Sequence, residues 1–385
     1  MPGRYKFFFL VLACSSLMAV AQVPQVRVRL FSGQNMPVSK VTGSDIRVNL
    51  HQGTQDTLQS SRDLVIQQVS GKIHIANERG DEMVADSVTC FSTKPFYITG
   101  PNGSKRLTTG KVVFRKRGST YLLAVNVLSM DNYLVGVVHA ELGRLEHPAL
   151  WSAQSIVART WFAQNRRKFF EQGECYAVTD DVQSQVYRGW PEDTTRLHNL
   201  QEAVLAFQDS IVVTPEGVPV EALFHANSGG QTLPSAWYFK PREYLQSVPD
   251  SFSLNCPQTT WTVQIGKEAF IGAFAIWLGK SSSDSVFRAF ICSYEQPVRA
   301  EYLTYEGSRV RLRNVREHFG LRSTWFSVTD NGAFVRLDGR GYGHGIGLSQ
   351  EGAYAMAKRG YSASQITAFY FPGTHLEAWS AAVWE

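Results

Sequence analysis

The stretch DNYLVGVVHAEL at residues 131–142 marks the point where the pattern of this sequence changes. From residue 23 to that point, apolar and polar side chains alternate in short runs such as VRVRL at 26–30 and KIHI at 72–75. Turn signals separate these runs, among them PNGS at 101–104. The pattern predicts a β-rich platform.

Beyond this stretch the apolar residues follow a helical period. Within residues 148–170 they recur every three or four positions, which predicts an amphipathic helix that begins at Pro148. The apolar run at 133–138 is interpreted as a strand that leads to Glu141, just before that helix. We therefore expect an α+β fold, with a β-rich N-terminal region and a mixed α/β core. Further helices are predicted at 197–207, 267–278 and 348–359, and strands at 112–114, 121–127, 210–213 and 222–225.

The composition is that of a globular protein. Hydrophobic residues make up 44% of the chain and charged residues 18%, which is too apolar for a disordered protein. The net charge is +5, and it falls to +3 when Arg4 and Lys6 leave with a leader. So small a charge lacks the basic signature of nucleic-acid binding, and no nucleic-acid partner is expected.

The first 21 residues read as a cleavable signal peptide. Arg4 and Lys6 precede an apolar stretch of about 14 residues, which is too short to span a bilayer. The small residues AVA at 19–21 suit a signal peptidase. We expect an extracytoplasmic protein, periplasmic or secreted. A second interpretation is a lipoprotein box, VLAC at 11–14, which makes a lipidated Cys14 the membrane anchor.

The cysteines that follow the leader allow more than one interpretation. In an oxidising compartment four cysteines can pair in three ways, and the sequence does not choose among them. Buried free thiols are equally consistent with their wide spacing, which contains no CxxC pattern typical of a metal site. These residues are Cys90, Cys175, Cys256 and Cys292.

Two further segments place polar side chains among glycines. The turn FHANSGGQT at 224–232 offers hydroxyl and amide groups that can bind sugars. The stretch GRGYGHGIG at 339–347, called the glycine ladder below, has a glycine at every second position. In an extended segment this spacing leaves one face bare, while Arg340, Tyr342 and His344 project from the other. No Rossmann unit surrounds the ladder, so a nucleotide site is not expected.

Taken together and in this order, five blocks resemble the SpoIID family, the stage II sporulation protein D and amidase-enhancer group of cell-wall proteins. The resemblance spans about residues 110–375 and implies a catalytic domain at 111–385 that follows the signal peptide at 1–21 and the β-rich region at 22–110. It also implies the partner, the glycan strands of peptidoglycan after their stem peptides have been removed. The blocks lie at 131–141, 153–160, 184–189, 225–232 and 341–350.

The activity that the resemblance implies is lytic transglycosylation, with Glu141 as acid and then base. Ordinary glycosidases need two carboxylates, whereas here the 6-hydroxyl of the substrate attacks and leaves a 1,6-anhydro ring. Glu141 must then hold a proton at neutral pH, which requires desolvation by apolar neighbours such as Val138 and Leu142. Arg159 is interpreted as a clamp for the lactyl carboxylate of the sugar.

The remaining substrate-binding residues are expected among polar and aromatic side chains of the same blocks. Rings at Trp190, Trp237 and Tyr238 can stack on sugars, and Asn227 can bind a hydroxyl group. Besides Arg159, the expected set is Gln185, Tyr187, His225, Ser228, Thr232, Arg340, Tyr342, His344 and Gln350.

Two alternatives stay open at this point. The first is a non-catalytic glycan-binding protein that enhances a cell-wall amidase, and the second is a hydrolase that pairs Glu141 with Asp180 or Asp181. Some family members carry a His and two Cys that bind zinc before the QVY segment, but here residues 177–184 contain no cysteine and Cys175 stands alone. We therefore expect no metal and no cofactor.

Overall fold

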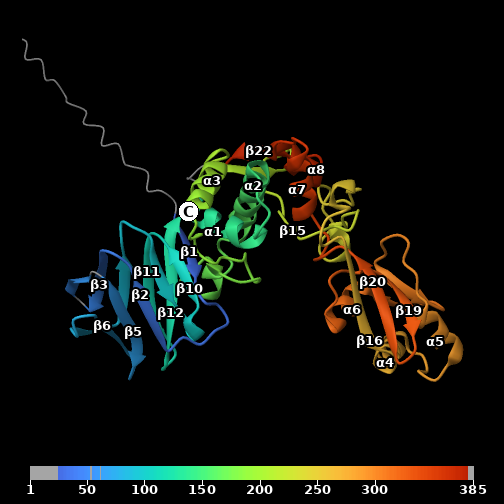
Figure 1. The fold of residues 1–385 in the computed structure, drawn as a ribbon, viewed down its shortest axis with the longest axis horizontal. Coiled ribbons are helices and arrows are strands. Elements are labelled where there is room, and N and C mark those ends of the chain that lie inside the picture. The colour runs from blue at the N-terminus through green and yellow to red at the C-terminus, as the bar shows by residue number, and fades with distance from the viewer. Residues whose placement is uncertain (1–24, 53, 61, 380–385) are drawn as a thin grey trace, which may run out of the picture.

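The computed structural model describes residues 25–52, 54–60 and 62–379, so the expected leader and Cys14 lie outside the described residues. Three lobes follow one another in an arch (Figure 1). A β-rich lobe comes first, a helical lobe stands in the middle, and residues 260–340 build a third lobe at the far end. We call the third part the inserted lobe, because the chain leaves the helical lobe to form it and then returns. The fold is α+β, as the sequence predicts.

The β-rich lobe consists of two sheets whose inward-facing side chains share one core. Burial alternates along strands such as β5 (Asp63–Val69) and β6 (Lys72–Asn77), which explains the alternation of apolar and polar residues. One sheet has the order β13 (Val178–Thr179), β1 (Gln25–Arg29), β12 (Tyr121–Ser129), β11 (Lys111–Arg117), β8 (Ser87–Phe91), β3 (Ile46–Gln52), β4 (Thr54–Ser60). The other has the order β10 (Lys105–Thr108), β9 (Phe96–Thr99), β2 (Val38–Thr42), β5 (Asp63–Val69), β6 (Lys72–Asn77), β7 (Glu82–Ala85).

Strand β12 differs from the others because it is buried on both faces. Leu122 and Ala124 face the core of the two sheets, whereas Leu123 and Val125 pack in a separate cluster with Phe169. This double burial explains the continuous apolar run in its sequence. The predicted strands at 26–30, 72–75, 112–114 and 121–127 are confirmed.

The helical lobe contains α1 (Met130–Leu142), α2 (Pro148–Asn165), α3 (Thr194–Leu205), α7 (Gln350–Lys358) and α8 (Ala363–Tyr370). The expected strand at 133–138 is wrong: these residues form the middle of α1, because Ser129 caps the helix and its apolar side chains are buried in the same core as α2. The helix predicted from Pro148 is confirmed, but it is not amphipathic. Residues 150–160 are all buried, because α1, α3, α7 and α8 pack around α2.

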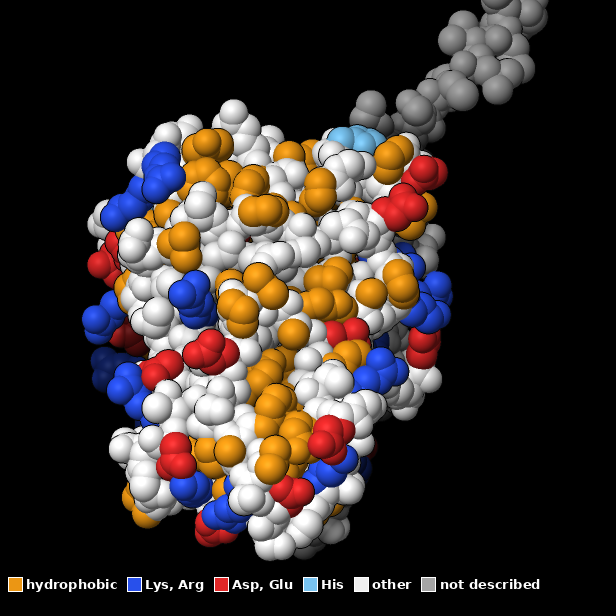
Figure 2. Space-filling view, turned by 90° about the vertical axis from the view of Figure 1, so that its right-hand side faces the viewer, with side chains coloured by type: hydrophobic (Ala, Val, Ile, Leu, Met, Phe, Trp, Pro, Cys, Tyr) orange, Lys and Arg blue, Asp and Glu red, His pale blue; other side chains and the backbone are white. Residues whose placement is uncertain are grey.

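The inserted lobe has a hydrophobic core of its own. Its sheet has the order β16 (Thr260–Gly266), β20 (Phe334–Arg340), β19 (Trp325–Asn331), with a hairpin of β17 (Tyr302–Tyr305) and β18 (Ser308–Arg311). Three helices complete it: α4 (Lys267–Leu278), with the predicted bounds, α5 (Ser285–Cys292) and α6 (Leu312–Phe319). Figure 2 views the molecule from this side and shows basic and acidic side chains interspersed rather than gathered by sign.

Short strand pairs and turns lie outside these sheets and helices. Strand β15 (Phe224–His225) pairs in parallel with β21 (Leu348–Ser349), and β14 (Ser210–Val213) pairs with β22 (His375–Ala378). Single 3-10 turns lie at Pro101–Gly103, Phe170–Gln172, Ser235–Trp237 and Ser251–Ser253.

Two observations concern the cysteines and the membrane. The four cysteines of the described part are free thiols, with Cys90 and Cys292 buried. No helix within the described ranges is both long and apolar enough to traverse a bilayer.

Candidate active site

Glu141 lies one residue before the end of α1, not before the start of a helix as the sequence suggested. Its Oε1 accepts a hydrogen bond of 2.7 Å from the backbone N–H of Val186, and its side chain is half-buried. The segment that contains Val186 therefore folds back over the C-terminal end of α1. At this end the helix dipole opposes a negative charge, whereas at an N-terminus it would favour one.

The surroundings of Glu141 favour its protonated form. Burial raises the pKa of this carboxyl above its usual value, and this effect outweighs the Val186 N–H and the Arg188 guanidinium, which both lower it. The negative end of the α1 dipole acts in the same direction as burial. An acid catalyst needs a carboxyl group that resists ionisation, and Glu141 meets this requirement.

Gln185 and Tyr187 hold Val186 in place from both sides. Gln185 accepts a hydrogen bond of 3.0 Å from the hydroxyl of Tyr133, and Tyr187 donates one of 3.1 Å to Asn126. The rings of Tyr133 and Tyr187 stack with centroids 5.8 Å apart. Gln185 and Tyr187 are both fully buried, so they position the backbone beside Glu141, and neither presents a face to a sugar.

Arg159 lies inside the helical lobe. Its guanidinium donates to the carbonyl oxygens of Phe207 and Ser210 at 3.0 and 3.1 Å and lies 3.6 Å from the carboxylate of Asp131. The side chain is completely buried. These contacts tie α2 to α1 and to the chain that leads into β14, and they leave the guanidinium away from any surface that a polymer can reach.

The two aspartates considered as partners for Glu141 have other contacts. The carboxylate of Asp180 accepts hydrogen bonds from the backbone N–H groups of Phe31 and Ser32 at 2.9 and 2.8 Å, and Arg106 lies 3.6 Å away. Asp181 Oδ1 accepts hydrogen bonds from the hydroxyl of Thr179 and from the backbone N–H of Gln183 in the same loop. Asp180 therefore anchors the 180–190 segment to the β-rich lobe.

The turn at 224–232 and the glycine ladder form a second cluster. Asn227 and Tyr342 exchange two backbone hydrogen bonds of 3.1 and 2.8 Å. The expected extended ladder with one bare face is wrong, because Gly341, Gly343, Gly345 and Gly347 all have positive φ, between 71° and 107°.

The glycines are needed because another backbone lies directly against them. A Cβ on Gly347 would stand 2.1 Å from the carbonyl oxygen of Leu223, and one on Gly343 would stand 2.8 Å from His225 Cβ. The alternation of glycines thus reflects the close approach of two backbone segments.

His225 and His344 face each other across this contact, with ring centroids 5.6 Å apart. His225 Nδ1–H donates to the carbonyl of Ile346 at 3.1 Å, and His344 Nδ1 accepts from the N–H of Ile346 at 3.1 Å. Burial lowers the pKa of His225 well below its usual value and that of His344 to about 4. Both rings are therefore neutral at pH 7.

The hydroxyl groups of this cluster bond within the protein. Ser228 donates to the buried carboxylate of Asp250 at 2.7 Å, and Thr232 Oγ1 accepts a hydrogen bond of 2.8 Å from the N–H of Val248. Gln350 is buried in the first turn of α7, and its Nε2 has no hydrogen-bond partner among the described residues. Ser349 is the N-cap of α7, and its side chain accepts a hydrogen bond from the N–H of Gly352.

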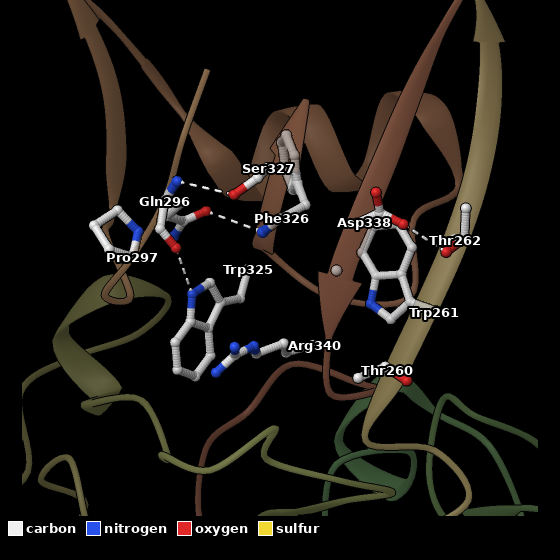
Figure 3. A pocket seen from close by; sticks show the side chains of 11 residues that line it. Thr260, Trp261, Thr262, Gln296, Pro297, Trp325, Phe326, Ser327, Asp338 and Arg340 are labelled. Carbon is white, nitrogen blue, oxygen red and sulfur yellow. Dashed lines mark hydrogen bonds between the residues drawn. The ribbon is translucent and has the colours of Figure 1, made fainter. Parts of the chain in front are cut away.

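Arg340 and Tyr342 are the exposed members of the expected set. Arg340 lines a cavity of about 440 Å³ on the sheet of the inserted lobe, where its guanidinium lies over the ring of Trp325, 5.4 Å from the centroid. Figure 3 shows Arg340 alongside Trp325, with Gln296 and Asp338 also at the cavity. Tyr342 carries the guanidinium of Arg322 over its ring.

The two clusters lie in different parts of the helical lobe. Helix α2 packs against α1, which carries Glu141, and also against α7, which follows the glycine ladder. Figure 1 shows α2 between α1 and α7. The five blocks therefore surround α2 rather than one cavity. No group of three or more His, Cys, Asp or Glu side chains in the part of the chain that the structure describes is arranged to hold a metal ion.

Comparison with known protein families finds a match that includes the region around Glu141. A sequence model of SpoIID, described as Stage II sporulation protein, matches residues 118–213. This part of the chain is therefore similar to the SpoIID family. The match contains Glu141 and the segment that holds it, whereas the turn at 224–232 and the glycine ladder lie beyond it.

Curated relatives extend the similarity to most of the length of the chain. Stage II sporulation protein D of Bacillus subtilis (strain 168) is 27% identical over 314 residues, which cover 78% of this chain and 88% of the relative. The protein of the same name from Bacillus amyloliquefaciens is 28% identical over 267 residues, or 66% and 75% of the two chains. The amidase enhancer of B. subtilis is 25% identical over 291 residues, which cover 61% of this chain and 39% of the enhancer.

The sequence analysis gave no role to several residues that the structure places near these clusters. Arg188, which lowers the pKa of Glu141, lies within the block at 184–189 but was given no role there, and Asp250, which accepts from Ser228, lies outside all five blocks. Arg299 donates to the carbonyl of Ser228 from the inserted lobe, far away in sequence. Only the fold brings these side chains to the site.

Proposed function

We propose that this protein is a peptidoglycan lytic transglycosylase that cuts the bond between N-acetylmuramic acid and N-acetylglucosamine in glycan strands without stem peptides. The observation that carries the proposal is Glu141: a half-buried carboxyl group with a raised pKa at the C-terminal end of α1, fixed through one oxygen by the N–H of Val186. Because Oε1 accepts this hydrogen bond, Oε2 is the oxygen from which the acid proton can leave.

The reaction needs one carboxyl group in two steps. Glu141 gives its proton to the glycosidic oxygen as the bond from C1 to that oxygen breaks, and the sugar with the new hydroxyl leaves. The ionised Glu141 then takes the proton of the 6-hydroxyl on the remaining sugar while that oxygen bonds to C1. A 1,6-anhydro ring forms, Glu141 regains its proton, and no water is consumed.

The contacts of Asp180 and Asp181 support one acid rather than two. A hydrolase needs a second carboxylate free to activate water or attack carbon. Asp180 instead accepts two backbone hydrogen bonds and pairs with Arg106, and Asp181 bonds to its own loop. The proposed reaction is therefore transglycosylation of glycan strands and not their hydrolysis. A position outside the cytoplasm, reached through the leader at 1–21, is part of the same proposal.

The test compares Glu141→Gln with Glu146→Gln. Both changes replace a carboxyl group by an isosteric amide, and the two residues are five positions apart in the chain. Unlike Glu141, Glu146 is exposed and pairs with Arg196. Sacculi first treated with an amidase are incubated with each variant, and 1,6-anhydro products are measured by mass spectrometry. We expect Glu141→Gln to lower their yield by about 10²–10⁴-fold and Glu146→Gln to leave it unchanged. An unchanged yield with Glu141→Gln rejects the proposal.

A second candidate is a glycan-binding enhancer of a cell-wall amidase, which the name of one B. subtilis relative favours. This function requires no acid at Glu141. Stimulation of an added N-acetylmuramoyl-L-alanine amidase that survives the Glu141→Gln change, with no anhydro product from the wild type, supports the enhancer instead.

A further inference from the structure

Unpaired cations gather on one face of the sheet that contains β1. Arg27 of β1 and Lys111 of β11 lie opposite the same residue of β12, the strand between them. Arg115 follows Lys111 by four positions, so its side chain points to the same side of the sheet. All three cations are exposed, whereas Val112 and Phe114 on β11 point into the core.

These cations have no acidic partners within the protein. No carboxylate among the described residues forms an ion pair with Arg27, Lys111 or Arg115, although Lys116, the next residue along β11, lies 3.4 Å from the carboxylate of Asp86. The three side chains line a shallow cavity of about 110 Å³. Like charges that stand together at a surface repel one another and attract an anionic partner.

The segment 166–176 lies on the same face. Its Phe169 and Tyr176 pack against apolar residues of β12, on the side of the sheet away from the main core. Cys175 of this segment lines the cavity that Arg27 also lines. The segment is therefore fixed beside the cations of the sheet.

The tip of this segment combines charge with an exposed ring. Arg167 and Lys168 are exposed, and Phe170, in the 3-10 turn that follows them, is 41% exposed. Glu171 and Glu174 are the acids of the segment. We call the following residues the cationic face: Arg27, Lys111, Arg115, Arg167, Lys168 and Phe170.

The cationic face accounts for the net positive charge of the protein. Five cations against the two glutamates of the segment leave +3, which equals the charge expected for the whole chain without its leader. The side of the molecule in Figure 2, by contrast, mixes both signs. Cations around an exposed aromatic ring are typical of proteins that lie on lipid, because the charges contact headgroups and the ring enters the interface.

The chain enters this face close to the expected leader. Gln25 begins β1 and lines the cavity itself, and the leader ends at residue 21. If Cys14 is the anchor, the eleven residues to Gln25 span at most about 40 Å, so the face stays near the membrane.

We propose that the cationic face docks this protein on a membrane surface that contains acidic phospholipids. The five cations lie against the phosphate groups, and Phe170 enters the boundary between headgroups and acyl chains. A soluble polyanion is the weaker fit, because it satisfies the cations but gives Phe170 no apolar partner. The inference rests on the position outside the cytoplasm in the proposed function, but not on the proposed reaction.

Vesicle sedimentation tests the inference. The protein is the chain from Gln22 onward, which contains every residue that the structure describes and cannot bind through the leader. The vesicles consist of phosphatidylcholine alone or of an equimolar mixture of phosphatidylcholine and phosphatidylglycerol. We expect binding to the mixed vesicles alone, and this binding weakens as the salt concentration rises. Equal binding to both kinds of vesicle overturns the inference.

A triple variant removes the cations of the sheet. Arg27→Gln, Lys111→Gln and Arg115→Gln together are expected to raise Kd for the mixed vesicles by about 10²-fold, because each basic residue near an anionic surface contributes to the affinity. All three side chains are exposed, so circular dichroism is expected to show an unchanged fold.

The matched control removes three exposed cations elsewhere on the surface. Lys240→Gln, Arg309→Gln and Lys358→Gln together change the net charge by the same amount and are expected to leave Kd unchanged. An equal rise of Kd in both triple variants shows an effect of net charge and overturns the inference.

Phe170 distinguishes a lipid surface from a soluble polyanion. Phe170→Ala is expected to raise Kd for the mixed vesicles by about tenfold, because a ring leaves the interface. Phe334→Ala, at an exposed ring of the inserted lobe, is expected to leave Kd unchanged. An unchanged Kd with Phe170→Ala indicates a site for polyanions and overturns the membrane proposal.

The proposed reaction is tested separately from this surface. Glu141→Gln is expected to bind the mixed vesicles as the wild type does. A protein that forms no 1,6-anhydro products but binds these vesicles rejects the reaction and supports the membrane surface, and the opposite result does the reverse.

Discussion

Glu141 obtains its chemistry from its position rather than from its neighbours in sequence. Burial and the C-terminal end of α1 both favour the protonated carboxyl, while the Val186 N–H and Arg188 moderate the shift. Arg188 is half-exposed and also bonds to the carbonyl of Asp180 at 2.9 Å, so the β-rich lobe fixes the charge that limits the pKa of Glu141.

This arrangement predicts the pH dependence of activity. Because the acid must be protonated, kcat/KM is expected to fall as pH rises through the raised pKa of Glu141. Arg188→Gln removes a charge that lowers this pKa, so the falling limb is expected to move to higher pH. Arg144→Gln, an exposed change near the end of the same helix, is expected to leave the limb in place. The pH profile of 1,6-anhydro product formation measures both.

The same pKa shift has a consequence for stability with a definite sign. The folded state holds the Glu141 proton more tightly than the unfolded state, so the free energy of unfolding decreases as pH rises from the ordinary carboxyl pKa through the raised one. Glu141→Gln is expected to remove this decrease. In the activity profile, a falling limb of kcat/KM that moves to lower pH with Arg188→Gln contradicts the assignment of the raised pKa to Glu141.

At the scale of elements, the glycine ladder is a join between two backbone segments. Its positive φ values and the bridge between Asn227 and Tyr342 bring β15 and β21 together and aim His225 at His344. The turn at 224–232 closes from the other side through Ser228 and Asp250. The sugar-binding side chains expected there depend on this join for their positions.

We expect Gly347→Ala to destabilise the protein by about 2–4 kcal/mol, because positive φ strains alanine and its Cβ would overlap the carbonyl of Leu223. Gly360→Ala is the matched control: its φ is 87°, but a Cβ there meets no atom within 4 Å. This change is expected to cost only about 1–2 kcal/mol. Chemical denaturation followed by circular dichroism gives both values, and equal losses would show that the ladder is not tightly packed.

At the scale of the whole molecule, two hydrophobic cores divide the chain. One runs through the β-rich and helical lobes, and the other fills the inserted lobe under β16, β19 and β20. Arg299 joins these two parts, because it reaches from the inserted lobe to the carbonyl of Ser228.

Two cores predict two unfolding transitions. Phe270→Ala in the inserted lobe and Phe114→Ala in the β-rich lobe each empty a fully buried site, at a cost of about 3–5 kcal/mol. In differential scanning calorimetry we expect each change to lower a different transition and to leave the other within a few degrees. A single transition that both variants lower alike would show that the cores unfold as one unit.

The sequence by itself determined elements whose signals are local. Helix α4 has the predicted bounds, the cap of α7 is at Ser349, and the strands of the β-rich lobe follow the alternation of side chains. Such signals depend on near neighbours in the chain, because periodicity and caps act within a turn or two. The motifs of the resemblance also indicated the SpoIID family, which the family match at 118–213 and the relatives support.

Only the tertiary structure decided what the individual site residues do. The run at 133–138 has the composition of a strand, yet it is a helix because its side chains are buried against neighbouring elements of the lobe. Arg159 is buried and donates to the carbonyl of Phe207, and Glu141 lies at the end of a helix beside Val186. Burial, charge pairing and pKa depend on groups distant in sequence, such as Asp131 with Arg159 or Ser228 with Arg299, and these meet only when the chain folds.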